Sequence, residues 1–307
     1  MVACANTMDT SWCALQRARP MGVHKLAHLR NSRTMDLPSY LRRIEYRGDL
    51  RPDLPTLQAL HRAHLNAVPF ENLDVQLRRP LDLSVEASYD KIVNRHRGGW
   101  CYEMNGLFGW ALEQIGFEVM RVSAGVMREQ RGDAQLGGHL CLLVQLERPY
   151  LTDVGFGGSM VEPLALERGT RLDAPYHLAL AEADDGFWRF SERVRAESFG
   201  FDFSPTPADE SLLARKCHAL QTEPASPFVQ NLVAQRRVGE SHVSLRGRVV
   251  TVTNAVREDK VMLHSPAELV DVLRDAFELD VPEAAALWPA ICARHEAVFG
   301  DDNQASL

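Results

Sequence analysis

Cysteine is scarce in this sequence, with six residues among 307, and no two of them form a Cys-x-x-Cys pair. Neither a disulfide scaffold nor a cysteine-based zinc site is therefore indicated. No stretch reaches the ~20 uncharged apolar residues that a membrane-spanning helix needs, and the glycine patterns of nucleotide-binding loops are missing. These absences argue against a disulfide-rich secreted domain, a membrane-spanning protein and a protein built around a phosphate-binding loop.

An excess of basic residues is also missing. The chain carries 34 Lys and Arg against 41 Asp and Glu, a net charge of −7 at pH 7. Proteins that bind nucleic acid or a membrane surface are more often basic, so neither partner is expected. What is present is an ordinary globular composition, 45% hydrophobic and 24% charged. We expect its thiols to be reduced, in a cytoplasmic protein.

The first 34 residues differ from the rest of the chain. They hold five basic residues and one acidic residue, so the remaining chain has a net charge of −11. No apolar run follows the basic residues, which argues against a secretory signal. An organelle transit peptide, a disordered extension and an upstream start codon stay open. We expect the folded protein to begin at Met35, because a good helix-opening pattern follows it directly.

Residues 100–115 carry the clearest helix pattern in the chain. Their apolar residues form one stripe at helical spacing, namely Met104, Leu107, Phe108, Ala111, Leu112 and Ile115. Gly116 suits the end of a helix, so Cys101 falls in the first turn. There, free N–H groups and the helix dipole favour a thiolate and an oxyanion on an attacked carbonyl. The alternative is a cysteine that simply fills the core, as we expect for the others.

From residue 118 the apolar pattern changes to a period of two, which predicts short antiparallel strands. The expected strands are 118–126, 139–146, 150–154, 176–181 and 187–191, with a further pair in 243–253 and a linker or crossing segment in 204–227. If 139–146 and 150–154 form a hairpin centred near residue 146, His139 and Asp153 lie opposite each other, about 5 Å apart. A nucleophilic cysteine needs such a histidine, and the histidine an orienting acid. Taken alone, His139 could equally be a core histidine and Asp153 a turn residue.

Two further histidines, His61 and His64, lie three residues apart in a segment with a helical pattern. They could share a metal ion, but no carboxylate or third ligand accompanies them at helical spacing. We therefore expect a packing or surface role and no metal. Cys141 falls in mid-strand, without the helix terminus that favours Cys101 as a nucleophile.

Five segments follow one another in the chain: PFENLD at 69–74, RGGWCYEMN at 97–105, HLCLLV at 139–144, DVGFG at 153–157 and SPFVQN at 226–231. In this order and spacing they resemble the motifs of the arylamine N-acetyltransferase family. The resemblance runs from about Asp36 to near the C-terminus. It implies an α+β fold with a papain-like cysteine-triad core. The expected parts are a basic, disordered extension (1–34), a helical bundle (35–117), an antiparallel β-barrel domain with a linker (118–222) and a C-terminal α/β lid (223–307).

The resemblance also implies an enzyme that carries an acetyl group through a Cys101 thioester by a ping-pong mechanism. The donor and co-substrate is acetyl-CoA, the acceptors are arylamines or arylhydrazines, and the role is in xenobiotic metabolism. The catalytic cysteine, histidine and aspartate of the family correspond to Cys101, His139 and Asp153.

Other positions carry weaker expectations. The aromatic residues that family members place around the acceptor are here Phe70, Phe156 and Phe228. Ordinary core packing is the alternative for each. Gly137 and Gly138, beside the histidine, could allow close approach of CoA, although glycine clusters are more often plain turns.

Arg97 and Glu71 resemble a structural ion pair that holds the first helices to the helix of Cys101. Two competing hypotheses remain for the function. The same three residues could serve hydrolysis, transpeptidation or amide synthesis, or the chain could be an inactive homologue that only binds. The intact set of three residues argues against the last. Oligomeric state and physiological acceptor stay open.

Overall fold

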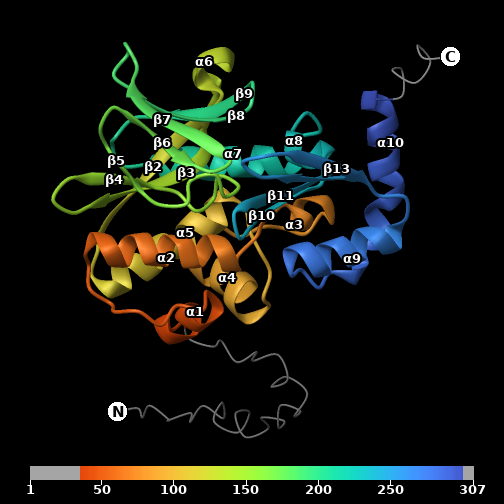
Figure 1. Cartoon of the computed structure of the whole chain (residues 1–307), viewed down its shortest axis with the longest axis horizontal. Helices are drawn as coiled ribbons and strands as arrows, with labels where there is room; N and C mark the ends of the chain where they lie inside the picture. Colours follow the sequence, from red (N-terminus) through yellow and green to blue (C-terminus); the bar gives the residue numbers. More distant parts are fainter. Residues whose placement is uncertain (1–34, 300–307) are drawn as a thin grey trace, which may run out of the picture. The chain divides into compact units, whose positions relative to one another are not determined.

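The computed structural model describes residues 35–299, so the expectations for residues 1–34 lie outside the described part. Helices and two antiparallel sheets make up the fold (Figure 1), which confirms the α+β class. The longer helices are α1 (Leu37–Arg43), α2 (Leu54–Ala67), α5 (Cys101–Ile115), α7 (Glu210–Thr222), α9 (Pro266–Phe277) and α10 (Trp288–Phe299). Short helical turns are α3 (Leu73–Gln76), α4 (Val85–Tyr89), η3 (Asp90–Asn94), α6 (Arg128–Arg131), η4 (Asp133–Gln135), α8 (Pro227–Gln230) and η5 (Pro282–Leu287).

The N-terminal helices begin where short polar side chains cap them. Asp36 accepts a hydrogen bond from the N–H of Ser39 at the start of α1, and Asp53 does the same for Thr56 in α2, each with proline in the first turn. The predicted helix is confirmed as α5, which ends at Gly116 with a φ of 106°, a backbone angle that favours glycine. In Figure 1, α1, α2, α4 and α5 lie together on one side of the eight-stranded sheet.

The eight-stranded sheet has the order β5-β4-β3-β2-β9-β8-β7-β6 and curls into part of a barrel. Its strands are β2 (Glu118–Val126), β3 (Leu136–Gln145), β4 (Pro149–Thr152), β5 (Leu164–Ala165), β6 (Gly169–Asp173), β7 (Tyr176–Glu182), β8 (Trp188–Val194) and β9 (Glu197–Phe203). The five strands predicted before residue 200 are confirmed to within a few residues, whereas β5, β6 and β9 were not predicted. Its strands contribute to one hydrophobic core, which includes the buried aromatic residues Phe190, Phe201 and Phe203.

The linker predicted within 204–227 is wrong in part, because this stretch holds α7. Asp209 caps the helix by accepting from the N–H of Leu212, and Leu213 and Cys217 bury one face. The prolines of this stretch stand on either side of the helix, where they cannot interrupt its hydrogen bonds; they are Pro205, Pro207, Pro224 and Pro227.

The second sheet has the order β1-β10-β11-β12-β13. Its strands are β1 (Phe70–Glu71), β10 (Val233–Val238), β11 (Ser241–Arg246), β12 (Val249–Thr253) and β13 (Glu258–Met262). Four strands come from the C-terminal third of the chain, but β1 comes from the segment between α2 and α3. A hydrophobic core that includes Leu245, Leu273 and Phe277 joins this sheet to α9. The sheet therefore couples the C-terminal part to the segment that leads into the site.

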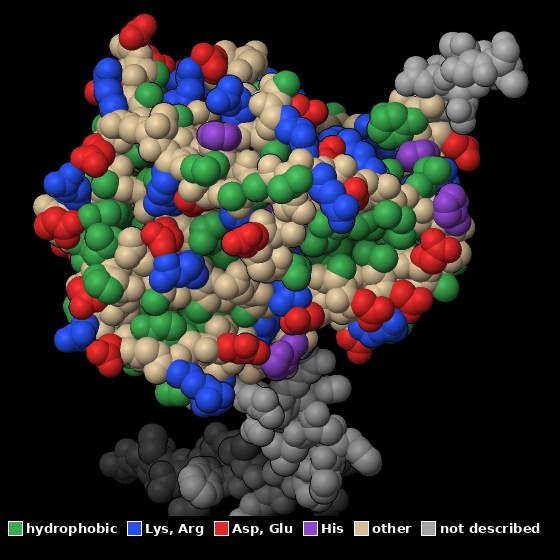
Figure 2. Space-filling model, in the orientation of Figure 1, with side chains coloured by type: hydrophobic (Ala, Val, Ile, Leu, Met, Phe, Trp, Pro, Cys, Tyr) green, Lys and Arg blue, Asp and Glu red, His purple; other side chains and the backbone are tan. Residues whose placement is uncertain are grey.

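The surface carries both signs of charge. Lys and Arg side chains alternate with Asp and Glu over the face in Figure 2, and hydrophobic side chains gather between β13 and α9. Within residues 35–299, none of the helices combines the length and the apolar character needed to cross a membrane.

Candidate active site

Two glycines place Cys101 at the start of α5. Gly98 lies so close to β1 that an added Cβ would stand 2.1 Å from the carbonyl oxygen of Pro69, so a side chain there would push the two segments apart. Gly99 completes the junction, since its N–H donates to Pro69 (3.2 Å) and its C=O accepts from Glu71 (2.9 Å). The thiol is therefore held at a fixed distance from the second sheet through backbone hydrogen bonds.

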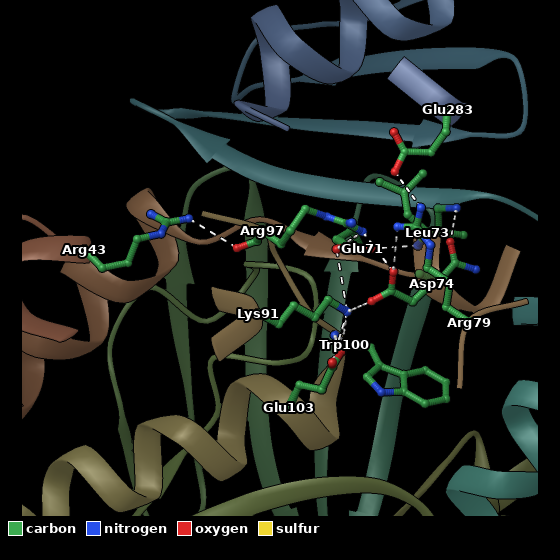
Figure 3. Close-up of polar contacts among 12 residues, drawn as sticks. Arg43, Glu71, Leu73, Asp74, Arg79, Lys91, Arg97, Trp100, Glu103 and Glu283 are labelled. Atoms are coloured by element: carbon green, nitrogen blue, oxygen red, sulfur yellow. Dashed lines mark hydrogen bonds and ion pairs between the residues drawn. The ribbon is translucent and has the colours of Figure 1, made fainter. Parts of the chain in front are cut away.

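A buried ionic cluster supports this junction (Figure 3). It consists of Glu71, Asp74, Lys91, Arg97 and Glu103. The predicted pair is confirmed, with 2.8 Å between Arg97 Nη2 and Glu71 Oε1. Lys91 Nζ lies 2.9 Å from carboxylate oxygens of both Asp74 and Glu103. Burial alone would lower the pKa of Lys91, but the carboxylates outweigh it and raise that pKa.

Glu103 connects the cluster to the helix start. Its Oε2 accepts from the backbone N–H of Trp100, the residue that caps α5, at 3.2 Å. Burial raises the pKa of Glu103, and the Lys91 ammonium opposes that effect. The cluster thus determines where the first turn begins, and with it the position of Cys101.

His139 and Asp153 meet as the sequence predicted. His139 Nε2 lies 2.6 Å from Asp153 Oδ2, and both residues are 2% exposed. The carboxylate can only accept, so Nε2 carries the proton of this hydrogen bond. Nδ1 then remains to interact with the Cys101 thiol, which also affects the pKa of His139. Burial alone would lower the pKa of His139, but Asp153 and Cys101 raise it to about 10. The two partners therefore favour the protonated imidazole.

The predicted geometry of the hairpin is wrong by one residue. The pairs Gln145↔Pro149 and Leu142↔Thr152 centre the hairpin on residue 147 and not 146. Pro149 opens β4 as its first paired residue, a position where its missing N–H is tolerated. As a result Asp153 lies beyond the last paired residue and reaches His139 diagonally on the same face of the sheet.

Asn105, one turn after Cys101 on α5, is a site residue that the sequence analysis missed. Its Nδ2 donates to Asp153 Oδ1 and to the carbonyl of Leu140, both at 2.7 Å, and its Oδ1 accepts from the N–H of Val154 at 3.0 Å. The spacing of four residues, which puts Asn105 on the same helix face as the cysteine, could have revealed it. Asn105 thereby orients the carboxylate that orients His139.

The loop after Asp153 packs directly on Cys101. An added Cβ on Gly155 would stand 2.6 Å from Cys101 Cα. The N–H of Gly155 donates to Asp153 Oδ1 at 2.8 Å. A glycine is thus required for the loop to bring the carboxylate and the thiol into one site.

The predicted aromatic positions fall into two groups. Phe70 and Phe228 lie 6.3 Å apart between ring centroids, and Trp100, next to Cys101, contacts Phe228 edge-on at 5.4 Å. Phe156 belongs to the histidine side, 5.2 Å from the His139 ring, and stacks on the partly exposed Phe199 at 5.3 Å. Aromatic surfaces therefore flank both the thiol and the imidazole.

Gly137 and Gly138 both face protein atoms. A Cβ on Gly137 would stand 2.7 Å from the Leu212 side chain on α7, and one on Gly138 would stand 2.9 Å from the carbonyl oxygen of Gln135. Packing therefore supplies a reason for each glycine. Contact of either with CoA stays a prediction.

Two other buried thiols, those of Cys141 and Cys217, lie near the site. Burial raises the pKa of Cys141 and of Cys217, which keeps both as neutral thiols. Cys141 Sγ contacts a backbone carbonyl, that of Val122. Within the described residues, no group of three or more metal-ligating side chains occurs.

The fold and the site define a protein with a buried cysteine, histidine and carboxylate gathered where a helix begins beside a curled antiparallel sheet. A family model described as N-acetyltransferase matches residues 53–286. Arylamine N-acetyltransferase from Mycolicibacterium smegmatis is 37% identical over 82% of this chain and 94% of its own length, and that from Mycobacterium tuberculosis (strain ATCC 25618 / H37Rv) is 36% identical over 81% and 91%. The chain belongs to the arylamine N-acetyltransferase family and is an acetyltransferase.

Solved structures agree with this assignment. The arylamine N-acetyltransferase of Mycobacterium marinum matches with a TM-score of 0.77 and 35% identity, over 83% of this chain and 98% of that one. The same enzyme in complex with CoA matches with a TM-score of 0.75 and 34% identity, over 84% and 98%.

Proposed function

We propose that this chain transfers the acetyl group of acetyl-CoA through Cys101 to the nitrogen of an arylamine or arylhydrazine. The observation that carries the proposal is the 2.6 Å contact of His139 with Asp153, which leaves the other imidazole nitrogen for a thiol at a helix start. Such an arrangement favours a thiolate paired with an imidazolium. A cysteine in this role must stay reduced, which suits a cytoplasmic protein.

Acetyl-CoA supplies an activated acetyl thioester. In the first half-reaction the Cys101 thiolate attacks the carbonyl carbon, and N–H groups of the first turn of α5 stabilise the oxyanion. His139 then gives its proton to the departing sulfur, so that CoA leaves as a thiol and acetyl-Cys101 remains. Asp153 keeps the proton-bearing tautomer of the imidazole in place.

In the second half-reaction His139 acts as the base. It takes a proton from the acceptor nitrogen as that nitrogen attacks acetyl-Cys101, and the Cys101 sulfur leaves as a thiolate. The products are an N-acetylated amine and the original ion pair. We assign Phe156 and Phe199 to the acceptor ring on the histidine side, and Phe70 with Phe228 to the thiol side, because planar aromatic rings pack well against such surfaces.

The test follows the release of CoA and the mass of the protein. Acetyl-CoA alone should add one acetyl group to the protein, and an arylamine should remove it while CoA release continues. Cys101→Ala should show no adduct, whereas Cys141→Ala, the matched control on a neighbouring strand, should acetylate normally.

Other outcomes favour the competing hypotheses. Continued CoA release without any amine would indicate a hydrolase. The absence of both adduct and release would indicate a homologue that only binds, and release dependent on amine but unaffected by Cys101→Ala would contradict the assigned nucleophile.

A further inference from the structure

The backbone of Asp153 has a second histidine as its partner. The N–H of Asp153 donates to His61 Nε2 at 3.3 Å, across 92 residues of sequence. This N–H is available because β4 ends at Thr152, so Asp153 has no place in the strand ladder. The carboxylate of the residue points to His139 while its backbone points to α2.

The same imidazole also holds the far end of the loop that follows Asp153. His61 Nδ1 lies 3.0 Å from the carbonyl oxygen of Val161. One ring thus connects the first and last residues of the segment 153–161, which carries Phe156 and packs on Cys101 through Gly155. A small displacement of this ring would move both ends of the loop.

Both contacts require a single protonation state of His61. The carbonyl of Val161 can only accept, so Nδ1 must carry a proton, and the N–H of Asp153 can only donate, so Nε2 must be bare. Neutral imidazole with the proton on Nδ1 is the form that satisfies both. In a protonated ring Nε2 would also carry a hydrogen, so two donors, Nε2–H and the N–H of Asp153, would face each other.

The surroundings of His61 favour that neutral form. The side chain is 0% exposed and meets Phe108 of α5 edge-on at 5.9 Å. The charged groups that act on it are Asp153 and Arg171, with opposite effects, and His64 lies one turn along α2. Burial lowers the pKa of His61 to about 4, so the ring does not compete with His139 for the carboxylate charge.

We propose that His61 is a positioning residue for the reaction: its neutral imidazole pins the backbone of Asp153 and the end of the 153–161 loop, so that the carboxylate meets His139 and the loop meets Cys101. The role rests on the proposed function of Cys101, His139 and Asp153. It predicts that loss of the Nε2 acceptor changes the chemistry of a thiol that His61 does not touch.

Two substitutions separate the two contacts. His61→Gln places an amide oxygen near the Nε2 position and can still accept from Asp153, whereas His61→Asn retains a donor for Val161 and leaves the Asp153 N–H unpaired. We expect His61→Asn to lower kcat for acetyl transfer by about tenfold to a hundredfold, because misplacement by a fraction of an ångström has effects of this order. His61→Gln should remain within about threefold of the unsubstituted protein, since its orientation of Asp153 is retained.

The decisive readout is the pH dependence of Cys101 alkylation by iodoacetamide, followed by peptide mass spectrometry. His61→Asn should slow alkylation at pH 7 and move its midpoint to higher pH, because a displaced Asp153 stabilises the imidazolium partner of the thiolate less. His64→Gln is the matched control: it removes an equally buried histidine from the same helix face, bonded to Tyr40 rather than to Asp153, and should lower stability without moving the midpoint.

An unchanged midpoint in His61→Asn, or equal losses in the Gln and Asn variants, would show a merely structural role and overturn the proposal. If His61→Asn does not fold, ¹⁵N NMR of the histidines in the unsubstituted protein decides. The expected signature is a neutral ring with the proton on Nδ1 at pH 6, and the opposite tautomer or a protonated ring refutes the assignment. Alkylation needs no acetyl-CoA, so failure of acetyl transfer alone would refute the proposed function and leave this test standing.

Discussion

Asp153 lies between two buried imidazoles whose pKa values shift in opposite directions. On one side His139 faces the carboxylate and Cys101, and its pKa rises to about 10. On the other side His61 faces a backbone carbonyl and a backbone N–H, and burial lowers its pKa to about 4. Both side chains are at most 2% exposed. Burial acts on both in the same direction, so the partner decides the charge.

The difference between His139 and His61 matters for the carboxylate of Asp153. Asp153 can stabilise one cation strongly, and a neutral ring behind its backbone leaves that stabilisation to His139. Asn105 serves the same end from α5, because it donates to the carboxylate oxygen that His139 does not use. Asp153 thus stabilises a positive charge on His139, whereas His61 on α2 holds the backbone of Asp153 in position.

Asp153→Asn should have the largest effect, because it removes the carboxylate that distinguishes His139 from His61. Without the carboxylate only Cys101 still opposes the effect of burial on His139, so the pKa of His139 should fall toward that of His61. Acetyl transfer should fall by about 10³- to 10⁴-fold, as the tautomer and the imidazolium lose their support. Steady-state rates with acetyl-CoA and an arylamine, together with NMR titration of His139, measure both effects.

The matched control for that variant is Asp202→Asn. Asp202 is equally buried but pairs with Arg189 outside the site, at 2.8 Å. It should lower stability and leave the rate near its original value. A rate for Asp153→Asn within tenfold of the unsubstituted protein would contradict the assigned role of the carboxylate.

The pH dependence of stability should separate the two sides in opposite directions. The pKa of His61 is depressed from 6.5 to about 4 in the folded protein. Its stabilisation is therefore complete above pH 6.5 and is lost as the pH falls toward 4, by about 3 kcal/mol. The pKa of His139 is raised, so its contribution is complete below pH 6.5 and is lost as the pH rises toward 10.

Urea unfolding at a series of pH values, with His61→Gln as the reference, isolates the acid branch. The variant should lose less stability than the unsubstituted protein between pH 6.5 and 4, because glutamine does not titrate. Parallel curves for the two proteins would show that His61 is not held neutral.

Asn105→Ala should have a smaller effect, and it tests how far the position of Asp153 depends on α5. The change removes the partner of the Val154 N–H and one of the two donors to Asp153 Oδ1, which keeps the N–H of Gly155. We therefore expect a loss of about 1–3 kcal/mol in the free energy of unfolding. A double-mutant cycle of acetyl-transfer rates with His61→Asn tests whether both residues act through Asp153. Strictly additive effects on the rate would argue that they act on separate parts of the site.

Cys141→Ala should show the smallest effect. Cys141 lies two residues after His139 on β3, but its thiol is buried, neutral and next to a carbonyl oxygen. Acetyl transfer should stay within about twofold, because the residue lacks the base and helix terminus that activate a cysteine. Loss of acetyl transfer in Cys141→Ala, with retention in Cys101→Ala, would reverse the assignment of the nucleophile.

Much of the site could be predicted from local patterns. The apolar stripe of 100–115 and Gly116 placed Cys101 in a first turn, because helix period and helix ends are properties of neighbouring residues. Alternation placed His139 on a strand and made a contact with Asp153 plausible. The register was off by one residue, since Pro149 joins the strand and not the turn.

Contacts across long separations could not be predicted in this way. Lys91 offered no local sign that it would be buried among carboxylates, and an isolated Lys inside a protein would be unstable. His61 showed only a packing stripe, and its link to Asp153 spans 92 residues. Such contacts depend on which surfaces meet when the helices pack on the sheet.

Local sequence patterns were enough to predict most of the strands, the helix of Cys101, and Cys101, His139 and Asp153 as candidate site residues, because periodicity, turn residues and short motifs act within one or two turns of chain. The tertiary structure decided in which direction the pKa of each imidazole shifts, since that depends on whether a carboxylate or a backbone group faces the ring after packing. It also decided how the start of α5 is fixed, through β1 and the ionic cluster, where segments distant in sequence exclude water together and make each charge depend on its neighbours.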